Sequence, residues 1–183
     1  YLIMAEIKST LELAMERTKN IGISEKERKE IKQREIGQKV NTLSHRFMQG
    51  HLSLNEILRE MEKMDEKTRT IAKEMLVSQW IDALSLEDED ERLLTGIESL
   101  KRRSTDQLKE KHHQVLSRYR REKEKVKENV RAQLTEALKR EGIYGSAVEV
   151  NIEASSLWKK EEENLDHLYS SKLEEIKEAL RSL

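Results

Sequence analysis

The feature that most constrains this chain is the stretch from Glu87 to Glu141, which contains a single glycine and no proline. Through this stretch apolar residues recur in steps of eleven, at Ile97, Leu108, Tyr119 and Val130. Eleven residues make almost three turns of an α-helix, so these side chains stay on one side of a nearly straight rod. The spacing predicts one continuous helix over residues 87–141, roughly 80 Å long at ~1.5 Å per residue. Such a helix predicts an elongated molecule.

The composition agrees with a long-helix protein. The 183-residue chain has no proline, no cysteine and six glycines, and charged residues make up 39% of it while aromatic residues make up 4%. This mixture is typical of long helices and coiled coils. The absence of cysteine excludes disulfides and thiolate metal sites. We therefore expect an all-α fold in which leucine, isoleucine, valine, methionine and alanine supply most of the buried surface.

Residues 1–84 predict a small N-terminal head of about four helices. The predicted helices cover residues 4–19, residues 25–49, the apolar stripe from Leu54 to Met64, and residues 66–84. Ser24 with Glu27, and Ser53 with Glu56, have the spacing of capping boxes at helix starts. The segment 66–84 is apolar around most of its circumference, which is typical of a buried helix. We expect it to form the centre of the head.

Residues 85–183 predict a coiled-coil hairpin with a hendecad-like repeat. Its first arm is the helix 87–141, followed by a turn or extended segment at 142–153 and a second helix at 155–182. Residues 99–140 carry 14 basic and 6 acidic side chains, whereas residues 141–183 carry 5 basic and 10 acidic ones. Opposite charge favours an antiparallel pairing of the two arms.

This pairing predicts a register and an uncovered surface. We expect Leu138 to face Leu157, Val130 to face Leu165, and Tyr119 to face Ile176. In that register the last helix reaches back only to about residue 112. The apolar stripe on residues 93–108 would then need another cover, which the head or a second copy of the chain could supply. This stripe is the argument for a homodimer.

The basic tract between Lys101 and Arg131 suggests nucleic-acid binding as an alternative function. A basic helix face can follow phosphates by releasing counterions. The residues that would carry this contact are Arg102, Arg103, Arg118, Arg120 and Arg121. Five acidic residues lie within the same tract, and few aromatic residues are available to stack on bases. Both facts favour the interpretation that the tract is a solvated, ion-paired face of the hairpin.

The sequence offers no pattern for catalysis, for a cofactor or for a metal. No glycine-rich phosphate loop, nucleophile elbow or dinucleotide fingerprint occurs. Glu110 and His113 have the spacing found in carboxylate-bridged metal sites of helical bundles, but such a site needs two of these pairs and further carboxylates. We therefore expect a non-enzymatic protein with no catalytic, cofactor-binding or metal-binding residues.

The function that the pattern favours is a scaffold or adaptor that binds protein partners through its stalk. The candidate contact residues are Val148, Val150 and Ile152, which alternate with polar residues as in a short strand, together with Trp158. An exposed strand could pair with a strand of the partner. No run of the sequence has the ~18 apolar residues of a membrane span, and the cytoplasm is the default compartment.

Overall fold

The computed structural model describes residues 24–145 and 148–183, and these residues form an all-helical fold without strands, as predicted. The helices are α2 (Glu25–Met48), α3 (Leu54–Glu62), α4 (Glu66–Ala83), α5 (Glu91–Lys101), α6 (Asp106–Arg140) and α7 (Ser156–Ser182). The helix predicted at residues 4–19 lies outside the described residues.

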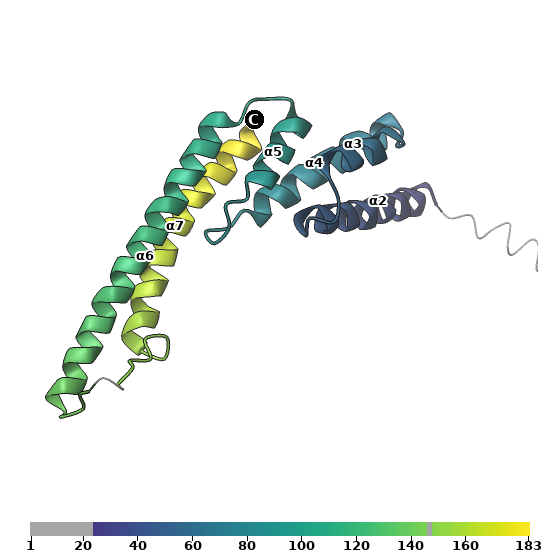
Figure 1. Ribbon diagram of the computed structural model, residues 1–183. Coiled ribbons are helices and arrows are strands. Elements are labelled where there is room, and N and C mark those ends of the chain that lie inside the picture. Colours follow the sequence, from purple (N-terminus) through teal and green to yellow (C-terminus); the bar gives the residue numbers. More distant parts are fainter. Residues whose placement is uncertain (1–23, 146–147) are drawn as a thin grey trace, which may run out of the picture.

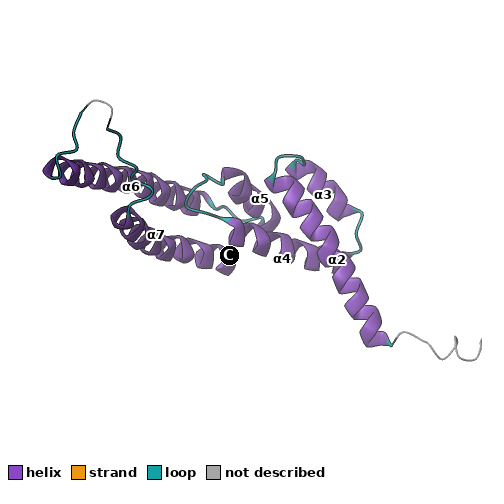
Figure 2. Ribbon diagram, turned by 90° about the horizontal axis from the view of Figure 1, so that it is seen from below, coloured by secondary structure: helices purple, strands orange, loops and turns teal. Residues whose placement is uncertain are grey.

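The molecule has two visibly different parts (Figure 1). Helices α2–α5 gather at one end, and we call them the head; α6 and α7 lie side by side and project away from it. We call α6, α7 and the segment between them the stalk. The turned view shows the same arrangement, with the C-terminal end of α7 back at the head (Figure 2).

Helix starts in the head follow the local signals in the sequence. Both predicted capping boxes form, since the hydroxyls of Ser24 and Ser53 accept the backbone N–H groups of Glu27 and Glu56. Asp65 caps α4 by accepting a hydrogen bond from the Thr68 backbone N–H at 3.0 Å. Hydrogen bonds from the Thr68 hydroxyl and backbone lower the pKa of Asp65 to about 2. The charged form of this cap is therefore favoured in the folded protein.

The continuous helix predicted over residues 87–141 is wrong, because the chain turns between Lys101 and Asp106. Arg102 ends α5 in the left-handed conformation with φ 55°, and its N–H donates to the Glu98 carbonyl. The Thr105 hydroxyl donates to the Glu98 carboxylate at 3.2 Å, and Lys109 of α6 forms an ion pair with the same carboxylate. An eleven-residue apolar repeat is equally compatible with two helices that a tight turn joins. The start is also later than predicted, since α5 begins at Glu91.

The turn lets α5 pack onto the head. Its buried side chains are Leu93, Leu94, Ile97 and Leu100, which join the main core with residues of α2, α3 and α4. The apolar stripe at residues 93–108 is thus covered within one chain as far as Leu100, so it no longer supports a homodimer. At Gly96, α5 approaches α4 so closely that an added Cβ would lie 2.6 Å from the Trp80 ring.

The main core also includes the end of the stalk. Leu173, Ile176 and Leu180 of α7 are buried in the same cluster as Trp80 and Ile97. The Lys101 ammonium donates to the carbonyls of Leu180 and Arg181 at 2.7 and 3.0 Å. The boundary predicted between residues 84 and 85 therefore falls inside a shared core.

The register of the stalk differs from the predicted one by about two helical turns. Tyr119 packs against Leu165 and Tyr169 instead of Ile176, and Val130 packs against Ile152 and Trp158 instead of Leu165. Because Ile152 lies against Val130, the connecting segment runs back along α6 before α7 begins. The two arms run in opposite directions, with Lys123 paired to Glu162 and Lys127 to Glu153.

Candidate interaction surfaces

Polar contacts hold α6 and α7 together in the middle of the stalk. The Tyr119 hydroxyl donates to the Asp166 carboxylate at 2.6 Å, and the Lys123 ammonium contacts both that hydroxyl and the Glu162 carboxylate, at 3.2 and 2.8 Å. Burial and the bond to Asp166 raise the pKa of Tyr119. Burial opposes the charge on Lys123, but its hydrogen bonds to Glu162 and Tyr119 outweigh this and raise its pKa. These groups bind one another, which makes them suited to holding the two helices together.

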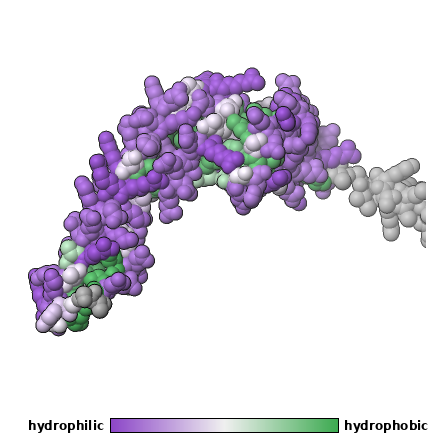
Figure 3. All heavy atoms as spheres, in the orientation of Figure 1, coloured by the Kyte–Doolittle hydropathy of each residue, from purple (hydrophilic) through white to green (hydrophobic). Residues whose placement is uncertain are grey.

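The far end of the stalk, by contrast, exposes apolar side chains. We define the tip as residues 141–145 and 148. Within it Ile143, Tyr144 and Val148 are 47%, 76% and 39% exposed. Figure 3 shows hydrophobic atoms gathered at this end of the molecule. A patch of this kind, surrounded by polar residues, is typical of a protein interaction site.

The backbone of the tip is ordered by the end of α6. Gly142 has φ +80°, a conformation that glycine adopts without strain. The N–H groups of Gly142 and Ile143 donate to the carbonyls of Lys139 and Leu138 at 3.0 and 2.9 Å. These bonds satisfy carbonyls that the helix end would leave free. The backbone that carries Ile143 is therefore tied to the end of α6.

The four predicted contact residues have different surroundings. Val148 is exposed and Val150 is half-buried, whereas Ile152 and Trp158 are each only 4% exposed in a cluster with Val130. Residues 148–152 form no strand. The alternation that resembled a strand instead places Ile152 against α6. Sequence reasoning overlooked Ile143 and Tyr144, although an apolar pair between two glycines is a signal that could have indicated them.

The arginines of the alternative nucleic-acid surface do not share one face. Arg102 and Arg103 lie in the turn before α6, while Arg118 and Arg121 are exposed on α6 itself. The guanidinium of Arg120 donates to the Glu89 carboxylate and to the Glu87 carbonyl, each at 2.9 Å. Arg120 thus connects the stalk to the loop before α5. Nothing in this geometry strengthens the nucleic-acid alternative, which remains a prediction.

The histidine pair on α6 divides into one buried and one exposed residue. His112 is 1% exposed and His113 is exposed. Burial lowers the pKa of His112, although a hydrogen bond to the Ser85 backbone opposes this effect. Within residues 24–145 and 148–183 no group of three or more histidine, aspartate or glutamate side chains has the arrangement of a metal site.

Comparisons with known proteins identified no relative of this chain. No family model matches the chain, and no curated protein or solved structure matches it significantly. In the part of the chain that the structure describes, none of the helices has the length and apolar character needed to traverse a lipid bilayer.

Proposed function

We propose that this chain is a non-enzymatic adaptor or scaffold that binds a protein partner through the tip of its stalk. The observation that carries the proposal is the concentration of exposed apolar residues there. Of the seven large hydrophobic residues that are exposed in the described part of the chain, three lie in the tip, between positions 143 and 148. The other four are scattered singly, which is normal for a protein surface.

The stalk supports this function by its length. The 35 residues of α6 extend about 50 Å at ~1.5 Å per residue. The contacts of Tyr119 and Lys123 hold α6 and α7 together in the middle of the stalk, and the paired helices keep the tip at a set distance from the head. Tyr144 is of a residue type that contributes strongly at protein interfaces. The stalk then acts as a spacer between the partner and the head.

The test compares the partners that two double variants retain. Ile143→Ser with Tyr144→Ser removes the apolar surface of the tip, where neither side chain is buried, so the fold is expected to persist. Ile71→Ser with Leu168→Ser removes two exposed apolar residues elsewhere, 38% and 51% exposed. Each protein is used as bait in a native lysate, and its bound proteins are quantified by mass spectrometry against the wild-type chain.

We expect the tip variant to lose a wild-type partner by at least about tenfold, because burial of apolar residues is the main contribution to such interfaces. The control variant should retain that partner. Equal loss from both variants would show that general surface hydrophobicity causes the association. Full retention by the tip variant, with unchanged circular dichroism, would contradict the proposal.

A further inference from the structure

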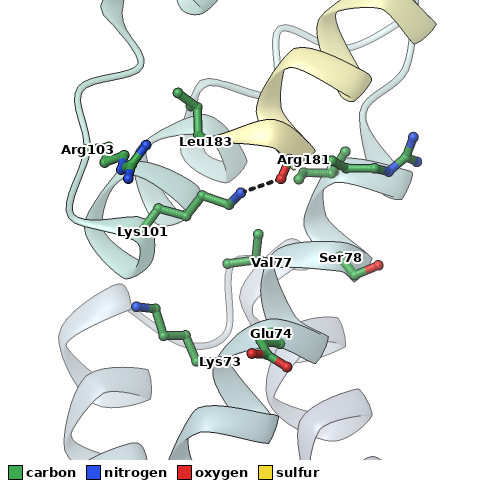
Figure 4. Close-up of a pocket in the computed structure, with 9 residues that line it drawn as sticks. Lys73, Glu74, Val77, Ser78, Lys101, Arg103, Arg181 and Leu183 are labelled. Atoms are coloured by element: carbon green, nitrogen blue, oxygen red, sulfur yellow. Dashed lines mark hydrogen bonds between the residues drawn. The ribbon is translucent and has the colours of Figure 1, made fainter.

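A pocket of about 450 Å³ lies where the head meets the base of the stalk (Figure 4). Three cationic side chains line it, each from a different part of the fold: Lys73 from α4, Lys101 from the end of α5, and Arg103 from the turn before α6. Lys101 and Arg103 are near neighbours in the sequence, whereas Lys73 is distant from both, and the packing of α5 on α4 brings it close to them.

The positive charges of this pocket are largely uncompensated. Among the described residues, Lys73, Lys101 and Arg103 form no ion pair with an acidic side chain. Glu74 is the one acidic residue in the lining. A fourth cation in the lining, Arg181, is engaged elsewhere, since it contacts Asp82 at 2.6 Å, and in Figure 4 its guanidinium points away from the other three.

The three cations also affect one another. Burial lowers the pKa of Lys101, and the nearby charges of Arg103 and Lys73 lower it further. Like charges held together in this way destabilise the charged forms, and a bound anion would relieve that repulsion. The pocket is therefore electrostatically suited to a negative group.

Apart from the cations, Glu74 and Ser78, the lining is apolar. Val77 and Ile81 of α4 are 6% and 1% exposed and form part of the pocket wall, together with Leu183. Small-molecule sites typically have volumes of about 300–1,000 Å³ and combine apolar walls with a few polar groups that orient the ligand. The size and lining of this pocket match that description.

We propose that this pocket binds a small organic anion. Its phosphate or carboxylate group lies against Lys73, Lys101 and Arg103, and its aliphatic body covers Val77 and Ile81. The site is separate from the tip, at the opposite end of the stalk, and does not depend on the function proposed for the tip. Since Lys101 also donates to the carbonyls of Leu180 and Arg181, the ligand would sit at the joint between head and stalk.

The test titrates four compounds into the whole chain and follows the methyl signals of Val77 and Ile81 by NMR. Octyl phosphate and octanoate, used below their micelle concentrations, supply the two anionic groups on the same aliphatic body. Octyl glucoside supplies that body without charge, and inorganic phosphate supplies charge without the body. We expect saturable shifts with at least one of the two octyl anions, and at least about tenfold weaker binding of both control compounds.

Two matched variants separate the pocket from general charge. Lys73→Gln with Arg103→Gln removes two cations of the lining and leaves Lys101 to hold α7. Lys67→Gln with Arg131→Gln removes the same net charge from exposed positions outside the pocket. The pocket variant should bind the octyl anion at least about tenfold more weakly, and the control should bind as the wild type does. The ligand should also raise the Tm of the wild-type chain by mass action.

Three results would overturn the inference. One is the absence of methyl shifts with both octyl anions. Another is that octyl glucoside or inorganic phosphate binds as tightly as the octyl anions. Equal binding of octyl glucoside would show that the charge is not needed, and equal binding of inorganic phosphate would show that the aliphatic body is not needed. The third is unchanged affinity in the Lys73→Gln, Arg103→Gln variant.

Discussion

At the scale of single residues, the close packing of Gly96 against Trp80 limits which residues the head can accept at position 96. Trp80 is fully buried and its ring centroid lies 4.6 Å from that of Phe47. The indole therefore has little space into which it could move. Gly96 permits α5 to approach α4, and the absence of a side chain at this position is a packing requirement.

Gly96→Ala is expected to destabilise the protein, even though alanine is the better helix former by ~1 kcal/mol. A Cβ at this position would lie 2.6 Å from Cζ3 of Trp80, so the ring or the helix must shift. Overpacking of this kind costs ~1–3 kcal/mol, and subtracting the gain in helix propensity leaves a net loss of up to about 2 kcal/mol. Urea unfolding, followed by circular dichroism, measures the change in the free energy of unfolding.

Gly37→Ala is the matched control. An added Cβ there would meet only the Met75 methyl at 3.5 Å, an ordinary contact, and Gly37 lies within α2. We expect this change to stabilise the protein by about 0.5–1 kcal/mol. Opposite signs for the two glycines would support the close approach at Gly96, and stabilisation by both would contradict it.

At the scale of helices, the turn between α5 and α6 decides the architecture. Arg102 has φ 55°, in the left-handed region that glycine adopts more readily than other residues. A chain that replaced this turn with helix would carry α5 away from α4 and expose Leu93, Leu94, Ile97 and Leu100. Burial of these residues outweighs the strain at Arg102.

Arg102→Gly tests the turn by the sign of its effect. In the observed structure glycine relieves the left-handed backbone, so we expect stabilisation by about 0.5–1 kcal/mol. In a continuous helix the same change would destabilise by ~1 kcal/mol. Ser99→Gly, at an exposed position inside α5, is the control and should destabilise by about 0.5 kcal/mol. Thermal and urea unfolding measure both, and a loss of stability in the Arg102 variant would favour the unbroken helix.

The helix ends that the sequence predicted correctly depend on local chemistry. The caps at Ser24 and Ser53 each need only a residue and its neighbour three positions later. Neither glycine nor proline marks the turn at Arg102. Ser104 and Gln107 do have the spacing of a capping box, but the helix starts after Thr105, which makes no side-chain cap hydrogen bond, so tertiary packing of α5 is the main contribution that favours the turn. The fold class therefore follows from the pattern, whereas this break is only weakly marked in it.

The register of the stalk and the candidate sites were unpredictable for a related reason. The position of α7 depends on Ile152 packing against Val130, and the spacing of residues within helices carries no information about that connecting segment. The exposure of Ile143 and Tyr144 follows from the same register. The cationic pocket needs Lys73 near Lys101, a proximity that exists only once α5 has folded back.

At the scale of the whole molecule, head and stalk share a core, and we expect them to unfold together. Leu173, Ile176 and Leu180 of α7 are buried among residues of α4 and α5. The two tryptophans report separately, since Trp80 lies in the head and Trp158 in the stalk. In a Trp158→Phe variant, Trp80 fluorescence and far-ultraviolet circular dichroism should give coincident urea transitions, as expected for one cooperative unit.

The reciprocal variant completes this test. Trp80→Phe leaves Trp158 as the fluorescent reporter of the stalk, and its transition should again coincide with the loss of helix. Each comparison is made within one variant, so the different stabilities of the two variants do not affect it. A second dichroism transition after the fluorescence change would indicate that residues 1–84 and 85–183 unfold independently, as two domains.

The hydrogen bonds from Lys101 to the carbonyls of Leu180 and Arg181 fasten the end of α7 to the head. One arm leaves the head through the turn at residues 102–105, and the other returns to it and is fastened there. A sideways force on the tip is consequently resisted by both α6 and α7, because each helix is fixed to the head at its base. One helix is then stretched along its axis while the other is compressed. One of the two points that fix the stalk, at Lys101, therefore also forms part of the wall of the cationic pocket.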